Sequence, residues 1–360
     1  MNFTEMQKQV ITTDKPHVLV LSSAASGKTA VIIERIRYLL EQGVDPSKIV
    51  AITFTNNAAS VMFERLGNPN GLFINTVHSY ANFLLRSDAV DTSDILNEER
   101  FDDLFEEIKN NPGCIKHVEY LIVDEAQDST EAQFEFFRLI NPDNYMYVGD
   151  IKQSIHKWNG ASPEHLIDLY YQNDVTVYKM VQNFRNLPDI LRFAKKFLYR
   201  LGPDYDDDSI AMRTNHGGPR YSVLEGNYSP SQAVQSLIAN KERLNTNWGD
   251  WFVLCRTNDD VDLFTTLFER EKVPTDTFKQ SELTNSQIEE RMKENTVKIL
   301  TGHSAKGLES PCVMVYNIRA YNDDEARLCY VAATRARDFL IWAKTPPKKR
   351  KRNTGIINWE

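Results

Sequence analysis

Residues 22 to 29 read Ser-Ser-Ala-Ala-Ser-Gly-Lys-Thr, and they stand between an apolar run, Val18 to Leu21, and a helix-like stretch, Ala30 to Ile36. A buried strand that enters a helix through Gly-Lys-Thr is typical of a phosphate-binding loop, because backbone N–H groups at a helix N-terminus bind anions. Lys28 adds a mobile positive charge for the outer phosphates, and Thr29 would hold Mg²⁺. This stretch predicts nucleotide hydrolysis on an α/β fold.

The loop departs from the strict motif at three positions. Ser22 stands where the motif begins with Gly, and Ser23 and Ala25 occupy further positions where Gly is common. An ordinary turn between a strand and a helix is therefore one alternative, and a small-molecule kinase or a GTPase with the same loop is another.

The composition sets the frame for the fold. With 360 residues, 41% of them hydrophobic, the chain can bury two cores of ordinary size. The formal net charge of −8 describes the whole surface and does not exclude a nucleic-acid partner in one cleft.

The cysteines are widely spaced, which predicts reduced thiols. No apolar run is long enough to span a bilayer, so we expect a cytoplasmic protein.

Short apolar runs alternate with amphipathic segments, which indicates parallel sheets covered by helices. The expected strands form two series: Val18 to Leu21, Ile49 to Phe54, Tyr120 to Val123, Tyr145 to Val148 and Val175 to Tyr178, then Tyr221 to Leu224, Trp251 to Cys255, Val297 to Leu300, Cys312 to Tyr316 and Phe339 to Ala343. We expect an α/β protein with two tandem lobes, residues 1–86 with 117–176 and residues 177–345. Residues 87–116 would be a small helical insertion, and 346–360 a basic tail.

An acid pair follows one of these strands. The segment Leu121 to Asp128 places Asp124 and Glu125 at the carboxyl edge, where open α/β sheets bind ligands. Asp124 would hold Mg²⁺, and Glu125 would orient and deprotonate the attacking water. Such pairs are also common in helix caps, so this interpretation depends on the phosphate loop upstream.

Further blocks follow in order. The segment Val148 to Ala161, Val-Gly-Asp-Ile-Lys-Gln-Ser-Ile-His-Lys-Trp-Asn-Gly-Ala, resembles the third motif of superfamily 1 UvrD/Rep-type helicases. Other blocks that resemble this family are Phe3 to Gln7, Thr53 to Ala59, Thr76 to Ser79, Gln182 to Arg185, Thr301 to Glu309 and Tyr330 to Ala336. The resemblance implies two RecA-like lobes that close on Mg-ATP, and a motor that moves 3′ to 5′ along single-stranded DNA.

The resemblance also implies roles for single residues. Gln153 would sense the γ-phosphate, and Arg185 and Arg335 would join Lys28 and Glu125 as catalytic residues by stabilising charge on the transferred phosphoryl group. The expected ATP-binding residues are Gln7 at the adenine edge, Ser26, Gly27, Lys28 and Thr29 at the phosphates, Phe184 on the base and Glu309 at the ribose. Taken singly, Phe184 could be a core residue and Arg335 part of a salt bridge.

A motor that holds single strands needs donors for phosphates and flat side chains for bases. Trp158 is the strongest stacking candidate, and its alternative is a core indole. The other expected DNA contacts are Phe54, Thr55, Asn56, His78, His156 and His303. His156 stands where the family often has another aromatic residue. Asn57 and Asn159 replace common basic residues, which removes positive charge beside the DNA.

The large insertions of the family are reduced here, so translocation is a safer expectation than efficient unwinding. We expect a monomer that acts on single-stranded DNA and duplex junctions, with replication or repair proteins as partners. The tail from Pro346 to Arg352 could bind DNA, act as a nuclear-import signal or be a solvated end. The alternative, which the glycine-poor loop leaves open, is a hydrolysis-deficient, helicase-like regulator that binds DNA or protein.

Overall fold

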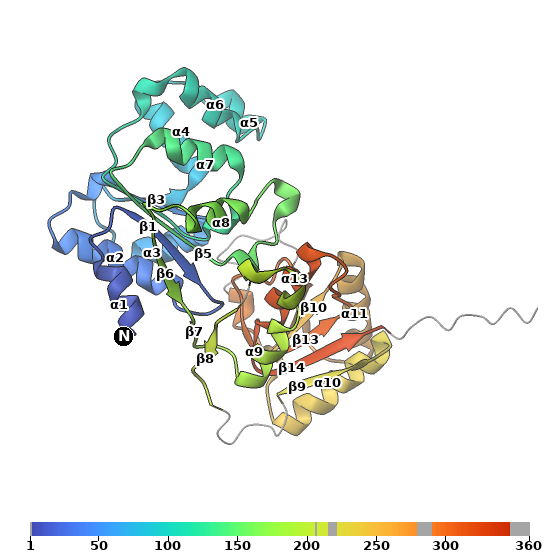
Figure 1. Ribbon diagram of the computed structural model, residues 1–360. Helices are drawn as coiled ribbons and strands as arrows, with labels where there is room; N and C mark the ends of the chain where they lie inside the picture. Colours follow the sequence, from blue (N-terminus) through green and yellow to red (C-terminus); the bar gives the residue numbers. More distant parts are fainter. Residues whose placement is uncertain (1, 206, 215–221, 279–289, 346–360) are drawn as a thin grey trace, which may run out of the picture. The chain divides into compact units, whose positions relative to one another are not determined.

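The computed structural model describes residues 2–205, 207–214, 222–278 and 290–345, so the basic tail lies outside the described residues. The chain divides into two compact units, Met1–Gly218 with Arg319–Arg337, and Pro219–Ile318 with Asp338–Glu360. A six-stranded sheet forms the centre of each unit (Figure 1). The predicted α/β class with two parallel sheets is confirmed.

The sheet of the first unit has the order β3-β2-β4-β5-β1-β6, and all its pairings are parallel. Its strands are β1 (His17–Ser22), β2 (Ile49–Thr53), β3 (Phe73–Thr76), β4 (Tyr120–Val123), β5 (Asn144–Gly149) and β6 (Thr176–Met180). The sequence predicts five of these strands because each is an apolar run. It does not indicate β3, whose four residues include only one that is buried.

Apolar residues on alternate sides of the strands build a core on each face of this sheet. Val18 and Val20 of β1 pack with α1 (Glu5–Thr12), α2 (Lys28–Glu41) and α3 (Asn56–Arg65). Leu19 points to the opposite face, which α4 (Val77–Ser87), α6 (Asp103–Asn110), α7 (Glu131–Ile140) and α8 (Glu164–Tyr170) cover. Burial on both faces is what a parallel strand requires. The arrangement is visible in Figure 1.

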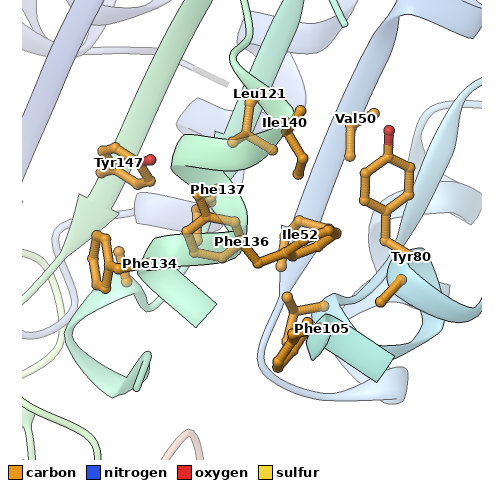
Figure 2. Close-up of a cluster of buried hydrophobic side chains, with 14 of the residues drawn as sticks. Val50, Ile52, Tyr80, Phe105, Leu121, Phe134, Phe136, Phe137, Ile140 and Tyr147 are labelled. Atoms are coloured by element: carbon orange, nitrogen blue, oxygen red, sulfur yellow. The ribbon is translucent and has the colours of Figure 1, made fainter. Parts of the chain in front are cut away.

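The core on the face of this sheet that α4, α6, α7 and α8 cover is rich in aromatic rings. Figure 2 shows Phe134, Phe136 and Phe137 of α7 in one cluster with Tyr80 of α4 and Phe105 of α6. Together with α5 (Ser93–Asn97), α6 lies in the segment 87–116 that the sequence predicts to be helical. Because Phe105 is 1% exposed and stacks on Phe136 at 5.1 Å, α6 packs firmly on the body of the unit.

The first unit extends beyond residue 176, where the sequence places the end of the first lobe. One reason is that β6 runs to Met180, where it still pairs with β1. The segment after β6 forms β7 (Gln182–Asn183), α9 (Pro188–Lys195) and β8 (Ile210–Ala211), and α9 contacts α13 (Asp323–Ala333). Both arginines expected at the phosphates therefore lie in the same compact unit as Lys28.

The second unit has the strand order β11-β12-β10-β13-β14-β9. The strands are β9 (Val223–Asn227), β10 (Trp251–Cys255), β11 (Thr275–Phe278), β12 (Val297–Thr301), β13 (Ser310–Tyr316) and β14 (Ala336–Lys344), with helices α10 (Pro230–Leu244) and α11 (Asn258–Arg270). Trp251 and Phe264 are fully buried in its core. Along the described part of the chain, no helix combines the length and apolarity needed to cross a membrane.

Candidate nucleotide site and DNA interface

The phosphate loop joins β1 to the first turn of α2. Gly27 caps this helix with a left-handed φ of 84°, a conformation that glycine adopts without strain. A Cβ at this position would lie 3.0 Å from Nε2 of Gln7, so a larger residue would also displace the Gln7 amide. Ser26 is 1% exposed, and Lys28 begins the helix. The loop therefore has the backbone geometry that the sequence predicts.

The residues that replace glycine in the loop have partners within the protein. The Ser22 hydroxyl donates to the Gly149 carbonyl at 3.0 Å. The Ser23 hydroxyl donates to Asp207 at 3.4 Å. Ala25 adopts a left-handed φ of 56°, which costs about 1 to 2 kcal/mol for a residue with a Cβ. The side chains thus stabilise the loop in place of the conformational freedom of glycine.

Gln7 packs against the phosphate loop from α1. Its Oε1 accepts from the Thr4 backbone N–H at 2.9 Å, as part of a capping box, and its Nε2 donates to the Ser26 carbonyl at 2.9 Å. Both ends of the amide are therefore engaged within the protein. Gln7 supports the loop directly, and its predicted role at the adenine edge would require these bonds to open.

Asp124 and Glu125 lie at the carboxyl end of β4, as predicted. Burial, followed by the neighbouring charge of Glu125, raises the pKa of Asp124 to about 7. Glu125 has a left-handed φ of 51°, and such strained residues cluster at active sites. Its Oε1 lies 3.7 Å from Nζ of Lys28. The structure thus brings the acid pair and the phosphate-loop lysine into one site.

A continuous chain of hydrogen bonds leads from Glu125 to Arg335 through side chains and one backbone N–H. Its second member is Gln127, which is fully buried, donates to Glu125 at 2.6 Å and accepts from the Asp150 backbone N–H at 2.9 Å. Asp150 accepts from Gln153 at 2.6 Å, and Gln153 accepts from Nη2 of Arg335 at 3.1 Å. The chain connects a candidate general base to a candidate phosphoryl-stabilising arginine.

Gln127 and Asp150 have no predicted role from the sequence, although both lie in the quoted motifs. A fully buried amide must find partners, because an unpaired buried polar group costs about 1 to 3 kcal/mol. The only hint in the sequence is that each polar residue follows a strongly apolar strand.

We expect Gln127→Leu to lower the free energy of unfolding by about 1 to 3 kcal/mol, because it leaves the Asp150 N–H without its acceptor. ATP turnover should fall as well, since Glu125 loses a donor. Urea unfolding and steady-state phosphate release check the two effects. Gln172→Leu, at an exposed position, is the control, and unchanged stability and turnover in Gln127→Leu would contradict the assignment.

Arg335 and Arg185 converge at the end of α13. Arg335 is 2% exposed, and its Nε donates to the Val331 carbonyl at 3.0 Å. Arg185 donates to the Thr334 carbonyl at 3.3 Å. The Phe184 backbone N–H donates to the Ala25 carbonyl of the phosphate loop at 3.1 Å, while its ring is 44% exposed. Phe184 is therefore not a core residue, and it lies beside the loop.

Asp207 contacts three parts of the site: the phosphate loop, α13 and Lys152. It accepts from Ser23 of the phosphate loop and from the hydroxyl of Tyr330 on α13, and it lies 3.4 Å from Nζ of Lys152. Burial opposes ionisation, yet the Lys152 charge and bonds from Ser209 lower the pKa of Asp207. This carboxylate fixes the phosphate loop against α13.

Three of the predicted DNA residues form an aromatic surface, and one of these also lines a cavity. Phe54, 42% exposed, stacks on His156 at 5.3 Å, and His156 meets Trp158 edge-on at 6.1 Å. Trp158 is 79% exposed, which excludes the alternative of a core indole. A cavity of about 430 Å³ extends from Phe54 and His78 to the acid pair. Phe54 and the acid pair thus line one continuous space.

Several predicted DNA residues have structural partners. The Thr55 hydroxyl caps α3 by accepting from the Ala58 N–H at 3.2 Å. His78 lies 3.2 Å from Asp102 and stacks on Phe105 at 5.3 Å. Asn56 lines the cavity. Thr55 therefore stabilises the start of α3, and His78 stabilises the packing of α4 against Asp102 and Phe105, in addition to any contacts with a ligand.

Two predicted residues lie in the other compact unit. His303 and Glu309 follow β12, and burial, together with the charge of Arg256, lowers the pKa of His303. Their predicted roles at the DNA and at the ribose stay predictions.

The phosphate loop at the carboxyl edge of a parallel sheet, with an acid pair two strands away across β5 and two arginines nearby, defines a P-loop nucleotide hydrolase of the RecA-like class. Comparison with known proteins gives the family. The UvrD/REP helicase N-terminal domain model matches residues 3–111 and 112–174, and the UvrD-like helicase C-terminal domain model matches residues 275–345. The chain belongs to the UvrD/REP helicase family, and the predicted enzyme class is confirmed at that level.

Individual relatives agree with this assignment. A probable DNA helicase of Mycoplasma pneumoniae is 26% identical over 94% of this chain and 83% of its own length. A probable DNA helicase II homolog of Mycoplasma capricolum is 26% identical over 74% of this chain, and the ATP-dependent DNA helicase Rep of Escherichia coli is 25% identical over 76%. The matches cover 50% and 55% of these two relatives, so the chain spans about half of their length.

Proposed function

We propose that this chain is an ATP-dependent motor that moves along single-stranded DNA, with hydrolysis in the first compact unit. The observation that carries the proposal is the hydrogen-bond chain from Glu125 through Gln127, Asp150 and Gln153 to Arg335. Such a chain gives the enzyme a direct connection between the group that activates water and the group that senses the phosphoryl charge.

Each candidate catalytic residue has a chemical task. Lys28 binds the outer phosphates, and Glu125 accepts a proton from the attacking water. Arg335, with Arg185 nearby, stabilises negative charge on the transferred phosphoryl group, and Gln153 positions Arg335 through its amide oxygen. The backbone N–H groups of the loop hold the phosphates in place.

The site also fits Mg²⁺. Asp124 is a buried carboxylate whose charge is poorly solvated, so a divalent cation would stabilise its ionised form in place of a proton. Asp124 and the Thr29 hydroxyl would hold the ion, which would neutralise charge on the phosphates. The proposed substrate is therefore Mg-ATP.

The competing proposal is a regulator that binds DNA or protein without hydrolysis. Its basis in the sequence is the glycine-poor loop, but Ser22 and Ser23 each stabilise this loop with a hydrogen bond. These bonds favour a loop that retains its geometry, and hence an active enzyme.

The test is phosphate release measured while single-stranded DNA, duplex DNA or RNA is titrated. The proposal predicts hydrolysis that single-stranded DNA stimulates most strongly. No hydrolysis under any condition would favour the regulator, and hydrolysis indifferent to nucleic acid would favour a different P-loop enzyme. The proposed 3′ to 5′ direction rests on the family resemblance, and displacement of streptavidin from biotin placed at either end of an oligonucleotide tests it.

We expect Trp158→Ala to weaken the affinity for single-stranded DNA by roughly 5- to 100-fold, the loss of about one stacked base. The melting temperature should stay unchanged, because the side chain is 79% exposed. Fluorescence anisotropy with a labelled oligothymidylate measures the affinity. Tyr199→Ala removes a similarly exposed ring, 76%, and serves as the control. Equal affinities for the two variants would contradict a stacking role for Trp158.

A further inference from the structure

The cavity between the acid pair and α4 has aromatic and amide side chains that the proposed motor function does not yet use. Phe101, in the turn between α5 and α6, lines it together with Phe54 and His78. Its volume of about 430 Å³ lies in the range of small-molecule sites. Ile52 and Phe137, which also line it, belong to the aromatic core in Figure 2, so one part of its wall is firmly packed.

Three carboxamides around this cavity present hydrogen-bond donors. The oxygens of Gln133 and Asn159 accept from backbone N–H groups, of Thr130 at 3.3 Å and of Ala161 at 3.2 Å. Because a backbone N–H can only donate, these bonds fix which end of each amide is oxygen. Asn82 accepts from the Thr92 hydroxyl at 2.6 Å. Within the described part of the chain, no hydrogen-bond partner is found for the three NH₂ groups.

The charge of the cavity selects among ligands that accept hydrogen bonds. Asp124, Glu125 and Asp128 line it, and no lysine or arginine does among the described residues. A phosphate group of the DNA would be repelled by these acids, and Lys28, 3.7 Å from Glu125, belongs to the phosphate loop. A nucleobase is neutral, has acceptor atoms on its edge and has a face that stacks on aromatic rings.

We propose that this cavity seats one base of the single-stranded substrate, stacked on Phe101, with the NH₂ groups of Gln133 and Asn82 donating to its acceptor edge. The inference rests on the proposed function and adds a binding subsite to it. A base in this position lies in the same cavity as Glu125, so the bound DNA reaches the hydrolytic site.

The first variant tests stacking. Phe101→Ala removes the aromatic ring, and Phe83→Ala is its matched control, because Phe83 is 45% exposed against 41% for Phe101 but does not line the cavity. The probes are an oligothymidylate and a strand of equal length in which every nucleotide is an abasic site. Phe101→Ala should weaken binding of oligothymidylate roughly 5- to 100-fold and leave binding of the abasic strand unchanged.

The second variant tests the donors without disturbing α7. Gln133→Glu keeps an oxygen for the Thr130 N–H, and hence the capping box, but exchanges the NH₂ group for an acceptor. Cytosine carries an amino donor where thymine carries an acceptor, so the affinity ratio of oligothymidylate to oligocytidylate should fall roughly tenfold. The added charge affects all strands alike, and the abasic strand measures that general effect.

The outcomes separate this inference from the proposed function. Wild-type affinity for oligothymidylate in Phe101→Ala, or an equal loss of affinity on both strands, would overturn the base site while DNA-stimulated hydrolysis by the wild type still stands. A wild-type protein that binds neither strand and whose hydrolysis no DNA stimulates would overturn both proposals.

Discussion

Replacement of Arg335 by Lys is expected to lower the rate of ATP hydrolysis by roughly 10³- to 10⁵-fold, the range found for phosphoryl-stabilising arginines. Lysine keeps the positive charge but loses the planar fork of donors. In this structure the fork reaches Gln153, Thr334 and the Val331 carbonyl at once, which one ammonium group cannot do. Single-turnover hydrolysis of radiolabelled ATP measures the effect.

Because Arg335 is 2% exposed, the variant could also lose stability. The melting temperature and nucleotide affinity are therefore measured on the same samples. Arg192→Lys, on the exposed face of α9, is the control for the substitution itself. Near-normal hydrolysis by a folded Arg335→Lys protein would show that this arginine does not act on the phosphoryl group.

Glu125→Gln is expected to reduce hydrolysis by roughly 10²- to 10⁴-fold, the usual contribution of a general base. Nucleotide affinity should be retained, since the amide has nearly the same shape and its loss of charge leaves Lys28 without a competing carboxylate at 3.7 Å. Equilibrium binding of a fluorescent ATP analogue and single-turnover hydrolysis separate binding from chemistry.

Glu64→Gln, an exposed glutamate of α3, is the control for Glu125→Gln. If Glu125→Gln hydrolysed ATP at the rate of the wild type, another group would have to activate the water. If it lost nucleotide binding instead, Glu125 would hold the loop rather than act in the chemistry.

The central elements of the fold could be predicted from the sequence because they obey simple periodicity. Runs such as Tyr120 to Val123 are apolar on both faces and begin and end as expected. β11, like β3, is four residues long, and it contains Asp276 and two threonines, so no apolar run marks it. Edge strands of this kind depend on their neighbours, and local sequence carries little information about them.

The candidate site was predictable where a motif fixes residue spacing, and less so where partners come from distant segments. The nearness of Glu125 to Lys28 follows from the topology of a parallel sheet. The role of Gln127 depends on Asp150, 23 positions later, and on exact side-chain directions. Likewise, nothing local in the sequence shows that Gln7 bonds Ser26 or that Asp207 joins Ser23.

The central claim is that Glu125 and Arg335 belong to one hydrolytic unit connected by a chain of hydrogen bonds, which is buried from Gln127 to Arg335. Single-turnover hydrolysis by the double variant Glu125→Gln/Arg335→Lys, compared with both single variants, tests this most directly. Residues that act as a unit are strongly non-additive, so the double variant should hydrolyse ATP about as fast as the slower single variant. If the rate of the double variant fell by the product of the two single-variant factors, the claim would be contradicted, since the two residues would then act independently.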